Sequence, residues 1–308
     1  MNIGPLHLKN PVMVASGTFG YGSEYGRFVD VSKLGGIVTK TLTPEPWPGN
    51  PPPRAAETAS GMLNSIGLQN VGVTAFIKEK LPYLQTLDTA LVVNVGGGPL
   101  DEFVYVTERL ADCEGIDAIE INMSCPNVAG GMDFSTDPIQ AAALVSRLRK
   151  LTDLPLIAKL TPNVTDITEV AATVEDAGAD AVSAINTIRG MAIDVGTRRP
   201  KLGANTGGLS GPAIKPVAVA AVWRIANRIK IPVVGIGGIT GAADALEFMI
   251  AGATGMQVGT ANFVEPSTGA TIIDDIYAWC RDHDVCAIRD LIGSVELSSQ
   301  EAIRCHNS

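Results

Sequence analysis

The chain has 308 residues, of which 46% are hydrophobic and 33 are glycine, and its formal net charge is −9. This composition is typical of a soluble α/β protein with a large core, and the acidic balance argues against a nucleic-acid surface, which needs clustered Lys and Arg. No apolar run approaches the roughly 20 residues that span a bilayer, and residues 1–9 lack a signal core, so we expect a cytoplasmic protein without a membrane partner.

The five cysteines, at positions 113, 125, 280, 286 and 305, are scattered along the chain without CxxC spacing. An odd number without this spacing indicates neither a disulfide framework nor a zinc site. We therefore expect no metal site, and we interpret four of the five as packing residues.

Eight short apolar runs, nearly all separated by helical patterns, dominate the chain. The predicted strands cover residues 12–15, 35–40, 90–95, 118–123, 155–160, 181–186, 232–236 and 255–258. The predicted helices cover residues 70–85, 99–113, 137–151, 165–177, 215–229 and 240–251, with another from about 268. Near-continuous apolar strands in βα alternation predict a parallel sheet closed into a (β/α)8 TIM barrel, as one domain over residues 1–308. An open doubly wound sheet is the alternative.

Three segments fall outside this alternation. Residues 1–9 are expected to form an N-terminal hairpin that plugs the bottom of the barrel, and residues 283–304 a final outer helix. The segment 43–64, after the second strand, is an irregular Pro-rich insertion whose prolines exclude helix. Its length predicts that it covers a face of the protein.

The residues at the strand ends are unusually polar, and in a barrel of this kind they converge on one rim. They are Ser16, Lys40, Asn94, Asn122, Lys159, Asn186 and Thr187, with Asn64 at the end of the insertion. Each alone could cap a loop, but the whole set predicts an active site.

The last two strands end in glycine-rich loops, at residues 235–240 (Gly-Ile-Gly-Gly-Ile-Thr) and 255–260 (Gly-Met-Gln-Val-Gly-Thr). Loops after strands 7 and 8 commonly bind phosphate in this fold, because backbone N–H groups can approach the anion. We predict a bound phosphate group there. The GxGxxG fingerprint of NAD-binding folds is absent from the sequence.

Candidate acids and bases are few on this rim. The three histidines, His7, His283 and His306, fall in the predicted hairpin and C-terminal segment. This leaves the Cys125 thiol, in a turn sequence after the fourth strand, and the two rim lysines.

Four carboxamides, Asn64, Asn122, Asn127 and Asn186, offer paired donors and acceptors. They complement a neutral planar ring with N–H and C=O groups, such as a pyrimidine. The Lys40 cation suits a carboxylate on that ring.

At these residues the sequence closely resembles the dihydroorotate dehydrogenases. The matching motifs are residues 122–127 (Asn-Met-Ser-Cys-Pro-Asn), 64–70 (Asn-Ser-Ile-Gly-Leu-Gln-Asn), 39–41 (Thr-Lys-Thr) and 207–216 (Gly-Gly-Leu-Ser-Gly-Pro-Ala-Ile-Lys-Pro). A cysteine at 125 is similar to the soluble class 1 enzymes. Residues 190–194 (Gly-Met-Ala-Ile-Asp) with the 207–216 run resemble the class 1B, NAD-linked catalytic subunit.

The resemblance implies oxidation of (S)-dihydroorotate to orotate in pyrimidine (UMP) biosynthesis, with the Cys125 thiolate removing the C5 proton and hydride passing to FMN. It implies an FMN site made of Ser16, Lys40, Thr41, Asn94, Asn122, Lys159, Ile185, Gly211, Gly237, Gly238, Gly259 and Thr260. The implied substrate contacts are Lys40, Asn64, Ser65, Ile66, Gly67, Leu68, Asn122, Asn127, Asn186 and Thr187.

The same resemblance implies partners. Electrons would pass to an iron–sulfur flavoprotein subunit that carries FAD and a [2Fe-2S] cluster, and on to NAD, in a heterotetramer with a homodimer core. The sequence lacks the cysteine-rich motifs of an iron–sulfur cluster, so this chain alone cannot complete the path.

One position departs from the family pattern, which has a glycine near Ser135. The loop after Cys125, which contains Gly130 and Gly131, is expected to close over the substrate.

Several alternatives stay open at this stage. They are a fumarate-linked class 1A enzyme, a flavin-dependent dihydropyrimidine dehydrogenase, a flavin-free aldolase or isomerase of phosphorylated sugars, and a non-catalytic barrel scaffold.

Overall fold

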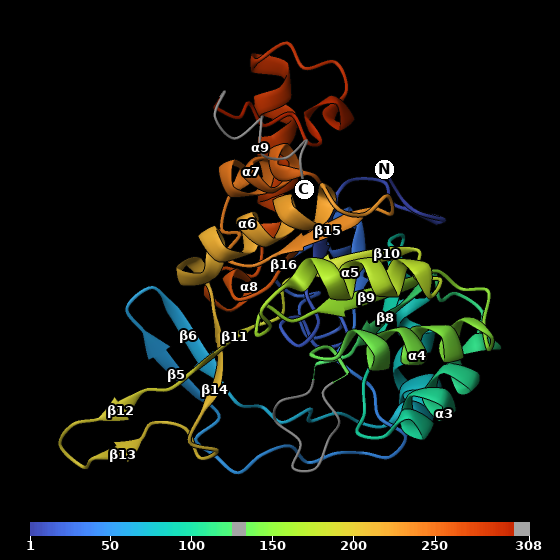
Figure 1. The fold of residues 1–308 in the computed structure, drawn as a ribbon, viewed down its shortest axis with the longest axis vertical. Helices are drawn as coiled ribbons and strands as arrows, with labels where there is room; N and C mark the ends of the chain where they lie inside the picture. The colour runs from blue at the N-terminus through green and yellow to red at the C-terminus, as the bar shows by residue number, and fades with distance from the viewer. Residues whose placement is uncertain (125–133, 299–308) are drawn as a thin grey trace.

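A computed structural model describes residues 1–124 and 134–298, and its centre is a closed barrel of eight parallel strands (Figure 1). Each strand pairs with the next one along the chain, and the last pairs with the first. The strands are β3 (Val12–Val14), β4 (Gly36–Val38), β7 (Ala90–Val95), β8 (Ala118–Asn122), β9 (Leu156–Leu160), β10 (Ala181–Ala184), β15 (Val233–Ile236) and β16 (Ala253–Val258). All eight predicted strands are confirmed, and with them the (β/α)8 barrel.

The helices surround the barrel, as Figure 1 shows for those that it labels. They are α1 (Val73–Ala75), a π-helical turn (Phe76–Lys80), α2 (Leu81–Leu84), α3 (Leu100–Ala111), α4 (Pro138–Arg149), α5 (Ile167–Asp176), α6 (Lys215–Ala226), α7 (Ala242–Ala251), α8 (Ala261–Val264) and α9 (Thr268–Asp282). In α3, for example, Phe103, Val106 and Leu110 are buried, and this spacing gives one apolar face toward the sheet. Among the described helices none is long and apolar enough to cross a membrane.

Local sequence sets where the helices begin. The side chain of Asp137 accepts a hydrogen bond from the backbone N–H of Ile139, 2.9 Å away, and Pro138 occupies the first turn of α4. Asp166 caps α5 in the same way through the N–H of Thr168. These residues satisfy backbone donors that have no partner within the helix.

The N-terminal segment forms the predicted hairpin, with β1 (Asn2–Ile3) antiparallel to β2 (Leu6–His7). Ile3, Leu6 and Leu8 are buried against the barrel residues Met13 and Val38, among others. The hairpin therefore closes the N-terminal end of the barrel with apolar side chains, and any ligand has to enter from the other end.

The predicted final helix is wrong for residues 283–298. Helix α9 ends at Asp282, and Asp284 adopts a left-handed conformation with φ of 56°. The N–H of Val285 then donates to the carbonyl of Cys280 at 2.8 Å, which is the hydrogen bond of a helix-terminating Schellman motif. A 3-10 turn (Ile288–Leu291) follows, and residues 299–304 lie outside the described ranges.

The Pro-rich insertion is only partly irregular. Its prolines precede a hairpin of β5 (Ala55–Thr58) and β6 (Gly61–Asn64), which the sequence did not predict. This hairpin joins β11 (Ile188–Gly190) and β14 (Gly207–Ser210), from the loop after β10, in an antiparallel sheet of order β11-β14-β6-β5. A second hairpin, β12 (Ile193–Asp194) with β13 (Arg199–Pro200), projects beyond this sheet (Figure 1).

Candidate active site

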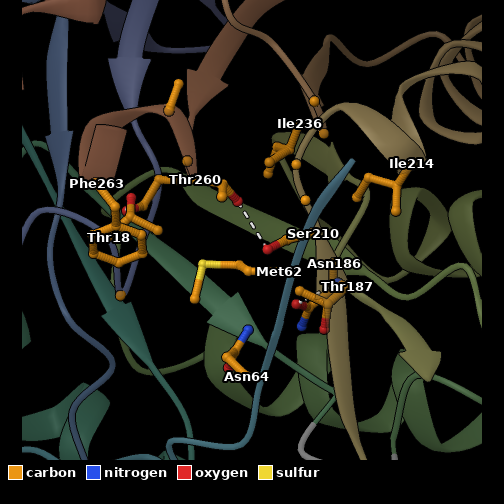
Figure 2. A pocket seen from close by; sticks show the side chains of 18 of the residues that line it. Thr18, Met62, Asn64, Asn186, Thr187, Ser210, Ile214, Ile236, Thr260 and Phe263 are labelled. Atoms are coloured by element: carbon orange, nitrogen blue, oxygen red, sulfur yellow. Dashed lines mark hydrogen bonds between the residues drawn. The ribbon is translucent and has the colours of Figure 1, made fainter. Parts of the chain in front are cut away.

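A cavity of about 1090 Å³ lies where the C-terminal ends of the barrel strands meet the β5–β6 hairpin and β14 (Figure 2). Most of the predicted site residues line it. They are Ser16, Lys40, Thr41, Asn64, Ile66, Gly67, Leu68, Asn122, Lys159, Ile185, Asn186, Thr187, Gly211, Gly237, Gly238, Gly259 and Thr260. The structure therefore brings together side chains from most of the barrel strands, as the closed barrel predicts.

Two predicted residues lie away from the cavity lining, and two lie outside the described residues. Ser65 and Asn94 are fully buried, and neither lines the cavity. Cys125 and Asn127 fall in the range 125–133, as does the loop with Gly130 and Gly131, so their predicted roles stay predictions.

A polar wall forms at the ends of β8 and β10. The Nδ2 atom of Asn186 donates to the hydroxyl of Ser124 at 2.7 Å and to Oδ1 of Asn122 at 3.3 Å. The backbone N–H of Thr187 in turn donates to Oδ1 of Asn186 at 2.8 Å. This pattern fixes the orientation of the Asn186 carboxamide, so the wall presents defined donors and acceptors.

The insertion hairpin forms a second wall. Met62 and Asn64 are two residues apart on β6, so both point to the same face, and Figure 2 shows them at the cavity. The Nδ2 atom of Asn64 donates to the carbonyl of Gly208 on β14 at 3.4 Å. Next to this strand, Leu68 has a φ of 58°, an uncommon conformation for a non-glycine residue that is found often at functional sites.

The glycine loops after β15 and β16 form a third side of the cavity. Gly237 and Gly238 have φ values of 133° and 71°, and a Cβ on Gly238 would lie 2.7 Å from Cβ of Lys215. The hydroxyl of Thr260, in the loop after β16, donates to the hydroxyl of Ser210 on β14 at 2.8 Å (Figure 2). Glycine is needed in this loop both for its backbone conformation and for its close packing.

An ion pair supports the loop after β15 from behind. Lys215 donates to Oδ1 of Asp244 at 2.8 Å, while the backbone N–H and the hydroxyl of Thr240 donate to Oδ2 at 2.8 and 2.7 Å. Burial raises the pKa of Asp244, but the hydrogen bonds from Lys215 and Thr240 outweigh it and leave the pKa below its ordinary value. The hydrogen bonds to Asp244 and Glu247 raise the pKa of Lys215.

Sequence reasoning missed an acid beneath the cavity. Glu120, in the middle of β8, is fully buried, and its carboxylate accepts hydrogen bonds from Asn94 at 2.6 Å and from Lys159 at 3.3 Å. Asn94 thus lies under the cavity and not in its lining. The available signal was an acid inside an apolar strand, two residues before Asn122 and therefore on the same face.

The described lining of the cavity contains no histidine. His7 lies in the N-terminal hairpin, and His283 stacks on Trp279 at the end of α9. His306 lies outside the described ranges.

Comparison with known proteins agrees with this geometry. The sequence profile of the family described as dihydroorotate dehydrogenase matches residues 1–279. This chain belongs to the dihydroorotate dehydrogenase family.

Among its relatives are proteins of Geotalea uraniireducens (52% identical), Pelobacter propionicus (51%) and Trichlorobacter lovleyi (52%). Each alignment covers 96% of this chain and 97 or 98% of the relative, and each relative is called dihydroorotate dehydrogenase B (NAD(+)), catalytic subunit.

Membership of the dihydroorotate dehydrogenases implies FMN as the cofactor of the catalytic chain, and the cavity fits this group. Its volume exceeds the roughly 300–1,000 Å³ of ordinary ligand pockets, so it has room for a cofactor and a substrate together. The glycine loops after β15 and β16 line the cavity without side chains that would keep a phosphate from the backbone, and Lys159 supplies a cation at the floor.

Proposed function

We propose that this protein is a catalytic subunit that oxidises (S)-dihydroorotate to orotate in pyrimidine biosynthesis. The observation that carries the proposal is that two lysines, a carboxamide wall and two glycine loops meet in one cavity. The names of the relatives support it, because each is a dihydroorotate dehydrogenase B catalytic subunit. In this proposal the chain is one (β/α)8 domain that works in the cytoplasm.

The loops after β15 and β16 would hold the phosphate of FMN, with Gly237, Gly238, Gly259 and Thr260 as its cradle. Ser16, Thr41, Asn122, Ile185 and Gly211, together with Lys40 and Lys159, would contact the rest of the cofactor. When bound, FMN supplies the acceptor for the hydride that leaves C6 of the substrate. Lys159 would stabilise the negative charge that reduction adds, since it lies buried at the cavity floor.

The substrate would lie against the carboxamide wall. Lys40 would bind its carboxylate, and Asn64, Asn122 and Asn186 would bind the N–H and C=O groups of its ring. Asn127 would complete this set, with residues 65–68 beside it. The fixed carboxamide of Asn186 is the strongest support for this arrangement, because an oriented amide selects one ring orientation.

Cys125 would act as the base that removes the proton from C5. The residue before it, Ser124, lines the cavity and contacts Asn186, and no histidine competes for this role in the described lining. A thiolate is basic enough for this task near neutral pH when nearby cations favour it.

The electrons would leave through a partner. The relatives' names contain both "catalytic subunit" and "NAD(+)", which supports a second subunit and NAD as final acceptor. We propose an iron–sulfur flavoprotein that carries FAD and a [2Fe-2S] cluster, bound to a homodimer of this chain in a heterotetramer.

The test is anaerobic mixing of the FMN-loaded protein with dihydroorotate. We expect bleaching of the flavin absorbance, and NAD reduction only when the partner is added. Fumarate turnover by the isolated chain would instead indicate a class 1A enzyme, and preference for dihydrouracil would indicate a dihydropyrimidine dehydrogenase. A colourless protein that takes up no FMN would overturn the proposal.

A further inference from the structure

A layer of polar side chains crosses the interior of the barrel, between the apolar bottom and the cavity. Along β7, β8 and β9, the buried apolar residues Val92, Ala118 and Ile157 are each followed two positions later by a polar residue on the same face. These polar residues are Asn94, Glu120 and Lys159, and Ser183 of β10 and Gln257 of β16 join them. Barrel interiors are usually filled with branched apolar side chains, so this layer needs a functional reason.

Glu120 is the centre of this layer. Its Oε1 accepts from Asn94 at 2.6 Å and from Lys159 at 3.3 Å. Its Oε2 accepts from Ser183 at 2.9 Å and from Gln257 at 2.6 Å. Four donors on two oxygens match the acceptor-only carboxylate.

Glu120 forms a buried ion pair with Lys159. The side chain of Glu120 is 0% exposed and that of Lys159 is 7% exposed, so solvent screens their interaction very little. A buried ion pair of this kind adds little net stability compared with apolar side chains of similar volume. Its value here lies in its position, because Lys159 also lines the floor of the cavity.

We propose that Glu120 is a positioning residue, which holds the Lys159 ammonium at the cavity floor and balances its charge, and so sets the redox potential of the bound FMN. The inference rests on the proposed function, since it takes Lys159 as a cofactor contact. A lysine side chain has four rotatable bonds, and the contact with Glu120 restricts it. The negative charge of Glu120 also partly cancels the positive charge of Lys159. It therefore limits how much Lys159 stabilises the negative charge that reduction adds to FMN.

The variant Glu120→Gln tests the charge with little change of shape. Its amide nitrogen can face Ser183, whose hydroxyl can accept, and Gln257, whose Oε1 is buried without a hydrogen-bond partner among the described residues. A flip of the Gln257 amide would therefore satisfy the new donor, while the new Oε1 still faces Asn94 and Lys159. The variant thus removes the negative charge and replaces one acceptor of Glu120 by a donor, with the side chain otherwise the same size.

The measurement is the midpoint potential of bound FMN, by equilibration with a reference dye, together with FMN affinity from fluorescence titration. We expect Glu120→Gln to move the potential to a more positive value. The positive charge of Lys159 is then no longer balanced, so it stabilises the negative charge of reduced FMN more strongly. The matched control Ser183→Ala removes a donor on the other oxygen and keeps both charges, so its potential should equal that of the wild type. A folded Glu120→Gln protein that binds FMN at the wild-type potential would overturn the inference.

A second variant, Glu120→Asp, tests the inference if the Glu120→Gln protein does not fold. Glu120→Asp keeps the charge but draws it back from Lys159 by one methylene, so a smaller shift in the same direction supports the proposal, and an unchanged potential overturns it. A wild-type protein that is not reduced by dihydroorotate refutes the proposed function, whereas normal reduction with an unaltered potential in the Glu120 variants refutes this inference alone.

Discussion

The carboxamide of Asn186 donates a hydrogen bond to the hydroxyl of Ser124 across 2.7 Å, and thereby joins the loops that follow β8 and β10. The same nitrogen lies 3.3 Å from Oδ1 of Asn122. One side chain thus orders two strand ends on the side of the cavity assigned to the substrate.

Replacement of Asn186 by alanine should lower kcat/KM for dihydroorotate by roughly ten- to a hundredfold, because loss of such a partner costs about 1–3 kcal/mol. FMN binding should change little, since the glycine loops are untouched. Steady-state and single-turnover flavin reduction measure the effect. The matched control Asn227→Ala removes an exposed asparagine whose side chain donates to the backbone carbonyl of Trp223, far from the cavity lining, and it should behave as wild type. Equal kinetics for both variants would contradict the proposed role.

Cys125→Ser should slow flavin reduction by dihydroorotate by roughly 10²–10⁴-fold, the usual contribution of a general base, while FMN stays bound. A serine hydroxyl is far less acidic than a thiol, so it cannot supply the base at neutral pH. Stopped-flow mixing under anaerobic conditions measures the rate. Cys113→Ser is the control, because that thiol lies just beyond α3 and outside the cavity lining. An unchanged single-turnover rate in Cys125→Ser would remove Cys125 from its role.

The sequence predicted all eight barrel strands, because each is an apolar run buried on both faces and bounded by turn residues. It did not predict the sheet over the cavity. There Asn64 of β6 pairs with Gly208 of β14, 144 positions away, and neither segment has a strand-like apolar pattern. Only the tertiary fold brings these two segments together, so no local pattern could reveal the pairing.

The candidate site likewise contains some residues whose positions the sequence predicted and others whose positions it did not. Rim residues such as Lys40 and Asn186 were predictable, because the strand ends of a closed barrel must converge. The placement of Asn94 beneath the cavity depends on its contact with Glu120, an acid that an apolar strand pattern conceals. The prediction of a final helix over residues 283–304 is wrong for residues 283–298 for a comparable reason. Helix α9 ends where Asp284 adopts a left-handed conformation, and the glycine that usually marks such a helix end in a sequence is absent there.

Gly238→Ala should weaken FMN binding and lower the free energy of unfolding by about 1–2 kcal/mol, the cost of a left-handed backbone for a residue with a Cβ. The new Cβ would also lie 2.9 Å from the carbonyl of Gly211. Gly241→Ala is the matched control in the same loop, because its Cβ meets nothing within 4 Å and its φ is −160°. Fluorescence titration with FMN and chemical denaturation measure the two effects. Equal FMN affinities in the two variants would argue against the phosphate cradle.

The pair of Lys215 and Asp244 makes the protein's stability depend on pH. The pKa of Asp244 is lower in the folded than in the unfolded chain. Its contribution to the free energy of unfolding is therefore fully present above the pKa of the unfolded chain, about 3.9, and is lost as pH falls through the pKa of the folded protein. The pKa of Lys215 is raised, so its contribution is lost only as pH rises through that folded value, above 10.5.

Asp244→Asn should therefore lower stability at neutral pH and flatten its decline in acid. Urea denaturation between about pH 3 and pH 7, the window that brackets an ordinary aspartate, measures the free energy of unfolding. Asp88→Asn is the matched control, because that carboxylate is 95% exposed in its pair with Lys9, and a surface pair of this kind contributes little. The interpretation is wrong if Asp244→Asn retains the full acid-dependent decline of the wild type. Since Asp244 holds Thr240 in the loop after β15, the same variant should also bind FMN more weakly.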